Sequence, residues 1–296
     1  MCGSDGELFI PGFLDIICTE VALCLLISLY CFVTDVVNLS GAVSGFFIGT
    51  ALLKVNVCYF TALMLCLLGG SKVAGYKAEK KILVFGKDLR KGQKRHWITV
   101  SANFCIASCI AFHSLRKTNT SSGLVIDMSD SSSWFNLAVL GIISSSSGDY
   151  WSAMIGSVSQ SQPRLITTWR KVPPGTNGAV NLAGFIASFV GGLVVGLGYY
   201  IGFISLSTLA LQEAPPQWPI IFAGGVGGFL GSFIDSYLGA LFEYSALSEK
   251  GQVVDMKQEH SNHISGMGFL DGKSITMLAG AINALLLPTL CQIFLP

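Results

Sequence analysis

Charged residues are scarce in this chain of 296 residues: they make up 12% of it, where an ordinary soluble domain carries about 25%. Hydrophobic residues make up 51%, and the mean hydropathy is +0.62. No charged side chain occurs from Pro173 to Gln212, a stretch longer than the ~20 apolar residues that a membrane-spanning helix needs. The scarcity of charge excludes an ordinary soluble protein and predicts a polytopic membrane protein.

Two features of secreted, disulfide-bonded proteins are also missing. Acids at Asp5 and Glu7, and the lack of any Lys or Arg before Lys54, do not fit the basic start of a cleavable signal peptide. We therefore expect the first apolar segment to remain as a span. The nine cysteines form no CxxC pair and no spacing typical of disulfides or metal sites, so we interpret them as small core residues.

Seven apolar runs alternate with polar segments, and we expect them to be helical because backbone polar groups need partners within a bilayer. The runs cover residues 13–33, 41–69, 97–114, 134–148, 178–206, 217–243 and 274–295. Two of them, 41–69 and 178–206, are long for one crossing at ~1.5 Å per residue, so each is either one tilted helix or a broken pair. The sequence predicts an all-α bundle with roughly six to nine membrane segments, forming one integral membrane domain over residues 1–296.

Positive charge is concentrated in one loop, since nine of the eighteen Lys and Arg residues lie between residues 70 and 96. By the positive-inside rule this loop faces the cytosol. If each long run crosses an odd number of times, segments 149–177 and 244–273 also lie on the cytosolic side. The basic loop further predicts affinity for anionic lipid headgroups, with nucleotide binding as the alternative.

The segment 115–133 is expected on the opposite side of the membrane. It contains Asn119-Thr120-Ser121, an acceptor triplet for glycosylation, which agrees with a lumenal position. We therefore expect a multi-pass protein of an endomembrane such as the endoplasmic reticulum.

Glycine is abundant, with 34 residues gathered mainly in three stretches, 40–49, 178–192 and 223–232. Small residues allow helices in membranes to pack closely, which is the simpler interpretation. The alternative is that one or more of these stretches begins a helix whose free backbone N–H groups meet an anion.

Two acids that we expect at the membrane boundary have suggestive neighbours. Asp149 follows a row of serines, and Asp235 stands among Gly231, Ser232 and Ser236 in an otherwise apolar helix. Carboxylates at a membrane boundary are costly unless they serve a function. Together with hydroxyls and water they suit Mg²⁺, which normally shares its ligand shell with phosphate oxygens. The alternative is that each acid pairs with a cation or meets water at the boundary.

The polar segment after Asp149 predicts phosphate binding. Cations and hydroxyls hold phosphate by charge-assisted hydrogen bonds, and a rigid Pro-Pro-Gly turn before a helix can present backbone N–H groups to an anion. The candidates are Arg164, Thr167, Thr168, Arg170, Lys171, Gly175, Thr176 and Asn177. Thr176 or Asn177 could instead serve as a plain helix cap.

Four stretches of the chain carry a resemblance to a known family. They are "GDYWSAMIG" (148–156), "PRLITTWRKVPPGTNGAVNLAG" (163–184), "PPQWPIIFAGG" (215–225) and "GSFIDSYLGA" (231–240). These stretches closely resemble the transmembrane protein 19 family, which is also similar to plant phytyl-phosphate kinase. The resemblance implies phosphoryl transfer from a nucleoside triphosphate to a lipid phosphate. It also implies an active site drawn from Asp149, Arg164, Thr167, Thr168, Lys171, Gly175, Thr176, Asn177 and Asp235.

The chain departs from the family pattern at polar positions. The first family motif reads GDTWASEIG, so Tyr150 replaces a Thr and Met154 replaces a Glu. A lost carboxylate weakens the case for metal-assisted catalysis. The leading hypothesis is a membrane-embedded kinase of a prenyl or other lipid phosphate, in which Asp149 and Asp235 hold Mg²⁺. The alternative is a non-catalytic paralogue that acts as a transporter or binds lipid or anions. We expect membrane lipid as a partner and no nucleic acid.

Overall fold

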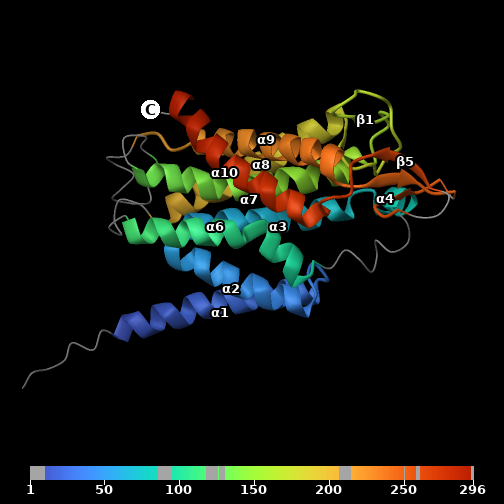
Figure 1. The fold of residues 1–296 in the computed structure, drawn as a ribbon. Helices are drawn as coiled ribbons and strands as arrows, with labels where there is room; N and C mark the ends of the chain where they lie inside the picture. Colours follow the sequence, from blue (N-terminus) through green and yellow to red (C-terminus); the bar gives the residue numbers. More distant parts are fainter. Residues whose placement is uncertain are drawn as a thin grey trace, which may run out of the picture.

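The protein folds into a bundle of helices with two small antiparallel sheets at one end (Figure 1). The structure, a computed structural model, describes residues 11–85, 95–117, 126, 131–206, 215–249, 251–257 and 261–294. The triplet Asn119-Thr120-Ser121 and residues 86–94 of the basic loop lie outside these ranges.

The described residues contain one short helix, α4 (Ala78–Phe85), and a set of long helices. The long helices are α1 (Pro11–Val33), α2 (Leu39–Val55), α3 (Val57–Gly75), α6 (Trp97–Lys117), α7 (Ser131–Gly156), α8 (Leu182–Leu206), α9 (Pro219–Phe242) and α10 (Gly272–Phe294). Five of them, α3, α6, α8, α9 and α10, are long and apolar enough to cross a membrane. The predicted helical membrane bundle is confirmed.

The two long apolar runs behave differently. Run 41–69 is broken at Asn56, whose backbone N–H donates to Leu52 O at 2.9 Å as α2 ends. The Asn56 Oδ1 accepts from Cys58 N at 2.8 Å as α3 begins, so one residue caps both helices. Run 178–206 supplies a single helix, α8. The first of the two runs is therefore a broken pair and the second is not.

The polar segments gather at one end of the bundle. Figure 1 shows α4, β1 and β5 at the same end, so the described parts of segments 70–96, 149–177 and 244–273 share it. The cytosolic orientation of this end stays a prediction. Cations of the basic loop have structural partners here. For example, Lys81 Nζ donates to Val73 O at 2.7 Å, and the Arg95 guanidinium lies 4.5 Å from the centre of the Tyr150 ring.

Helix α7 forms the centre of the bundle and contacts α3, α6, α8, α9 and α10. Its middle turns are completely buried, including Leu137, Leu140 and Ile143. Because other helices surround it, α7 tolerates a row of four buried serines, residues 144–147. One of them, Ser147, donates from its Oγ to Gly191 O on α8 at 3.0 Å. This hydrogen bond links α7 to α8 within the core.

Glycine allows α7, α8 and α9 to approach backbone to backbone. A Cβ placed on Gly148 of α7 would collide with the backbone of Gly228 on α9, and one on Gly192 of α8 would collide with Gly224. Asn283 of α10 adds hydrogen bonds from its Nδ2 to Gly141 O at 2.8 Å and Gly227 O at 2.9 Å. The packing interpretation of the glycines therefore holds for these helices.

The first prediction concerns this contact. We expect Gly148→Ala to lower the thermal unfolding midpoint of the detergent-purified protein, because α7 and α9 must separate to admit the methyl group, at a cost of about 1–3 kcal/mol. Gly45→Ala is the matched control, since a Cβ at this α2 glycine would meet nothing within 4 Å. Equal midpoints for the two variants would show that the α7–α9 contact is looser than described.

Candidate functional site

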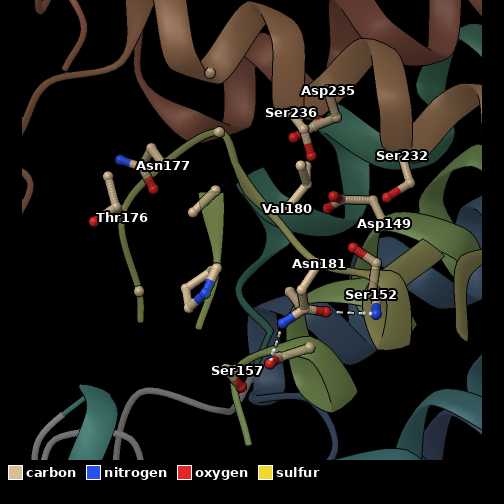
Figure 2. A pocket seen from close by; sticks show the side chains of 18 of the residues that line it. Asp149, Ser152, Ser157, Thr176, Asn177, Val180, Asn181, Ser232, Asp235 and Ser236 are labelled. Atoms are coloured by element: carbon tan, nitrogen blue, oxygen red, sulfur yellow. Dashed lines mark hydrogen bonds between the residues drawn. The ribbon is translucent and has the colours of Figure 1, made fainter. Parts of the chain in front are cut away.

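A cavity of about 330 Å³ lies where α7 and α9 end and where α8 and α10 begin. We call it the site cavity. Its walls are the last two turns of α7, the turn 174–181, the C-terminal half of α9 and the first residues of α10 (Figure 2). Four helix ends and one loop thus enclose a space at the polar end of the bundle.

Two of the predicted acids face this cavity. Asp149 reaches it from α7 and Asp235 from α9, and Figure 2 shows both side chains directed into the same space, with Ser232 beside them. The Oδ2 atom of Asp235 is buried and makes no hydrogen bond within the described part of the chain. A buried carboxylate oxygen without a donor needs a cation or a proton, so this atom is a candidate ligand for a metal ion.

Glu243 is a third acid on the cavity wall, and sequence reasoning assigned it no role in the site. Its pKa is raised to about 7, chiefly by burial and then by the charges of Asp255, Asp149 and Asp271 in that order. Asp235 lies in α9, and Glu243 directly follows this helix, eight residues or about two turns later. This spacing is the sequence signal that could have placed both acids in one site. The cavity therefore has a strongly acidic wall.

The Pro-Pro-Gly turn forms another wall and is held by its own polar groups. Thr176 is buried and donates from its Oγ1 to Pro173 O at 2.8 Å. The backbone N–H of Asn177 donates to Ser245 Oγ at 3.1 Å. Gly175 and Gly178 have φ values of 92° and 77°, a region that residues with a Cβ rarely adopt. The local sequence thus specifies a rigid turn, and the Thr176 hydroxyl and the Asn177 backbone N–H are already engaged.

The start of α8 differs from the sequence-based expectation. The helix begins at Leu182 rather than directly after Gly178, and neither Thr176 nor Asn177 caps it. Asn181 caps it instead, because its Oδ1 accepts from Gly184 N at 2.7 Å. Its Nδ2 donates to Gly156 O at 2.8 Å, which ties the end of α7 to the start of α8. Asn181 also lines the site cavity and holds two of its walls together.

The remaining predicted phosphate-binding residues lie outside the cavity, on a short hairpin. Strand β1 (Arg164–Leu165) pairs with β2 (Ala179–Val180), and Arg164 forms a second bridge with Lys171. The Arg164 Nη1 donates to Trp169 O at 2.8 Å. Five predicted side chains are exposed there and do not line the cavity: Arg164, Thr167, Thr168, Arg170 and Lys171. The structure brings together Asp149, Asp235, Gly175, Thr176 and Asn177, and it separates the five exposed residues from them.

Met154, which replaces the Glu of the resembled motif, does not line the cavity either. It lies one helical turn after Tyr150, whose ring lies beneath the Arg95 guanidinium on the α3 side of α7. The cavity-facing positions of α7 are Asp149, Ser152, Ala153 and Gly156. The substitution therefore removes no carboxylate from this cavity.

The donor set fits Mg²⁺ that shares its shell with phosphate and water. Within the described ranges, no three His, Cys, Asp or Glu side chains lie close enough together to hold a metal ion by themselves. Mg²⁺ is usually held by one or two carboxylates and completes its octahedral shell with water and substrate phosphates. Asp149 and Asp235, with Ser232, Ser236 and Thr276 nearby on the cavity wall, match that requirement.

A second small sheet follows α9 and is joined to the turn 174–181 by hydrogen bonds of Asn177. It consists of β3 (Ser245–Leu247), flanked by β4 (Val253–Val254) and β5 (Asn262–Ser265). Asn177 joins this sheet to the turn, since its Nδ2 donates to Tyr244 O at 3.4 Å. The polar segment 244–273 is thus part of the site's framework.

Comparison with known proteins assigns the chain to a family. The family model described as integral membrane protein DUF92 matches residues 22–284, which include every residue of the site cavity. The chain belongs to this family. No solved structure is detectably similar to it.

Proteins from plants, archaea and cyanobacteria are similar to this member of the DUF92 family. Protein PGR of Arabidopsis thaliana is 31% identical over 252 residues, which cover 84% of this chain and 87% of PGR. An uncharacterized membrane protein of Methanocaldococcus jannaschii is 32% identical over 53% of this chain and 54% of its own length. An uncharacterized membrane protein of Synechocystis is 32% identical over 34% of this chain and 47% of its own length.

The second prediction concerns the pH dependence of stability at Glu243. Its pKa is raised from 4.5 to about 7 in the folded protein, so folding favours the protonated form. This stabilisation is fully present below about pH 4.5 and is lost as the pH rises to 7. We expect Glu243→Gln to match the wild type at pH 4.5 and to exceed it above pH 7, by on the order of 1–2 kcal/mol after solvent screening.

Unfolding midpoints of the detergent-purified protein between pH 4.5 and 8 check this prediction. Glu249→Gln is the control, because Glu249 is exposed and does not line the cavity. A difference between Glu243→Gln and the wild type that stays constant with pH would contradict the described burial of Glu243.

Proposed function

We propose that this DUF92 protein is a membrane-embedded kinase that transfers a phosphoryl group from a nucleoside triphosphate to a prenyl or other lipid phosphate. The observation that carries the proposal is the meeting of Asp149 and Asp235 in one cavity at the polar end of the bundle. The resemblance to the transmembrane protein 19 family and to plant phytyl-phosphate kinase supports it. We further propose an endomembrane, such as the endoplasmic reticulum, as its location.

The reaction is an exchange at phosphorus. An oxygen of the lipid phosphate forms a bond to the γ-phosphorus of the nucleotide, and the bond from that phosphorus to the β–γ bridging oxygen breaks. The products are a lipid diphosphate and a nucleoside diphosphate. Because the attacking group is already an anion, the protein needs to position the two phosphates and offset their charge rather than remove a proton.

The residues of this chain divide that work between them. Asp149 and Asp235 would hold Mg²⁺, which would neutralise charge on the phosphate oxygens. Asn181 fixes the distance between α7 and α8 through its two hydrogen bonds, at 2.7 and 2.8 Å. Arg164 and Lys171, on the exposed hairpin, are proposed to attract the anionic nucleotide toward the cavity.

A second candidate function is a non-catalytic lipid- or anion-binding protein or a transporter. One observation favours it: every charged side chain on the described cavity wall is an acid, and Arg164 and Lys171 lie outside. Of these alternatives, transport has less support, because buried side chains of α7 such as Leu137 and Leu140 fill the core of the bundle beyond the cavity. The kinase proposal accounts for both the acids and the closed core.

The third prediction tests the kinase directly. Protein purified into lipid nanodiscs is mixed with γ-labelled nucleotide, Mg²⁺ and a panel of prenyl monophosphates, and labelled lipid is separated by chromatography. We expect Mg²⁺-dependent transfer that falls at least about 100-fold in Asp149→Asn and in Asp235→Asn, because each removes stabilisation of transferring charge.

Glu249→Gln is the charge-matched control, and we expect it to retain wild-type transfer because it stands outside the cavity. A well-folded wild-type protein that transfers label to none of the prenyl phosphates would overturn the proposal in favour of the non-catalytic function.

A further inference from the structure

The outer surface of the α8–α9 pair carries phenylalanine side chains that begin at the site cavity. Phe185 lines the cavity, and its ring centre lies 5.5 Å from that of Phe229 and 6.5 Å from that of Phe233. The Phe185 and Phe233 rings are nearly parallel, with 27° between their planes. One side chain therefore belongs both to the cavity wall and to an aromatic cluster on the membrane-facing side.

The cluster continues toward the middle of the membrane. A Cβ placed on Gly225 of α9 would lie 2.9 Å from the Phe189 ring of α8, so this ring fills the space that the glycine leaves. We call Phe185, Phe189, Phe229 and Phe233 the aromatic seam. From Phe233 to Gly225 it extends eight residues along α9, or about 12 Å.

The seam is open to the bilayer. The exposed fractions of Phe229 and Phe233 are 36% and 41%, and neighbouring Leu182 and Ile186 reach 72% and 58%. Glycine contacts between α8 and α9 close the space beneath, so an apolar chain could lie along the seam but not pass between the helices. The result is a shallow apolar surface with one end in a cavity suited to phosphate and Mg²⁺.

We propose that the aromatic seam binds the apolar tail of a lipid phosphate whose headgroup occupies the site cavity. This inference rests on the proposed function for the identity of the headgroup. Phe185 indicates the occupant, because it belongs both to the site cavity and to the seam. The tail of a phosphate bound near Asp149 and Asp235 would pass this side chain as it enters the bilayer. An isoprenoid chain is apolar along its length and can pack against the aromatic faces of the seam.

The aromatic seam contributes little to binding affinity, because the lipid around it is already apolar. A tail that moves from lipid onto protein leaves one apolar surrounding for another, so burial from water supplies no driving force. Only better packing contacts remain. The seam therefore selects among tails and orients the headgroup more than it tightens binding.

The experiment uses a farnesyl monophosphate that carries a photoreactive diazirine near its tail end. Protein in lipid nanodiscs is labelled with this probe, and the adducts are located by mass spectrometry. We expect adducts on the residues of the aromatic seam and competition by unmodified farnesyl monophosphate. Phe185→Ala and Phe233→Ala should each lower labelling about three- to tenfold, as for loss of one aromatic contact.

Matched variants separate a specific seam from general lipid exposure. Phe47→Ala on α2 removes a ring that is 66% exposed and also contacts a neighbouring ring, Phe46, and it should leave labelling unchanged. Phe185→Leu and Phe233→Leu keep most of the apolar volume and replace the alanine variants if those do not fold. We expect them to lower labelling too, but less than the alanine variants do. Adducts on α1, α2 or α6 instead, or undiminished labelling in both alanine variants, would overturn the inference.

The outcome for the seam is distinguishable from the outcome for the kinase. Seam-specific labelling without phosphoryl transfer supports the tail site and removes the enzymatic proposal. Transfer to prenyl phosphates with labelling elsewhere preserves the enzyme and overturns the tail site.

Discussion

The close contact of three glycine-bearing helices is the constraint on which the rest of the structure depends. Backbone approach at Gly148, Gly192 and Gly228 brings α7, α8 and α9 together without intervening side chains. Asp149 immediately follows Gly148, and Asp235 lies seven residues after Gly228. The same contacts that pack the bundle therefore set the separation of the two acids. Small residues matter here because lipid tails are as apolar as the core, so helices associate through packing.

Asp149 and Asp235 lie in surroundings between hydrocarbon and open water, which favour the binding of a cation by carboxylates. A carboxylate within hydrocarbon is costly, and one in open water is too well solvated to bind a cation tightly. The site cavity is intermediate: it is formed by four helix ends and the turn 174–181. In the proposed function, a lipid headgroup would reach it without its tail leaving the bilayer. This arrangement explains why a stretch as polar as 148–178 stands between two apolar runs.

The sequence predicted the features that depend on local composition. Apolar length predicted the helices, and counting crossings from the basic loop placed segments 149–177 and 244–273 at one end, because helices that alternate in direction return their ends there. Other features depend on tertiary contacts that no local pattern carries. The approach of Glu243 to the cavity, the capping of α8 by Asn181 and the separation of Arg164 and Lys171 from the acids are of this kind. The roles of the predicted site residues stay predictions.

The central claim is that Asp149 and Asp235 act on one cation. Titration of Mn²⁺ followed by electron paramagnetic resonance, with protein in nanodiscs and farnesyl monophosphate present, tests it most directly. If they share one ion, Asp149→Asn and Asp235→Asn should each weaken Mn²⁺ binding at least about tenfold, and the double variant should lose little more, since ligands of one site are not additive. Independent, additive losses, or unchanged binding in either single variant, would contradict the account.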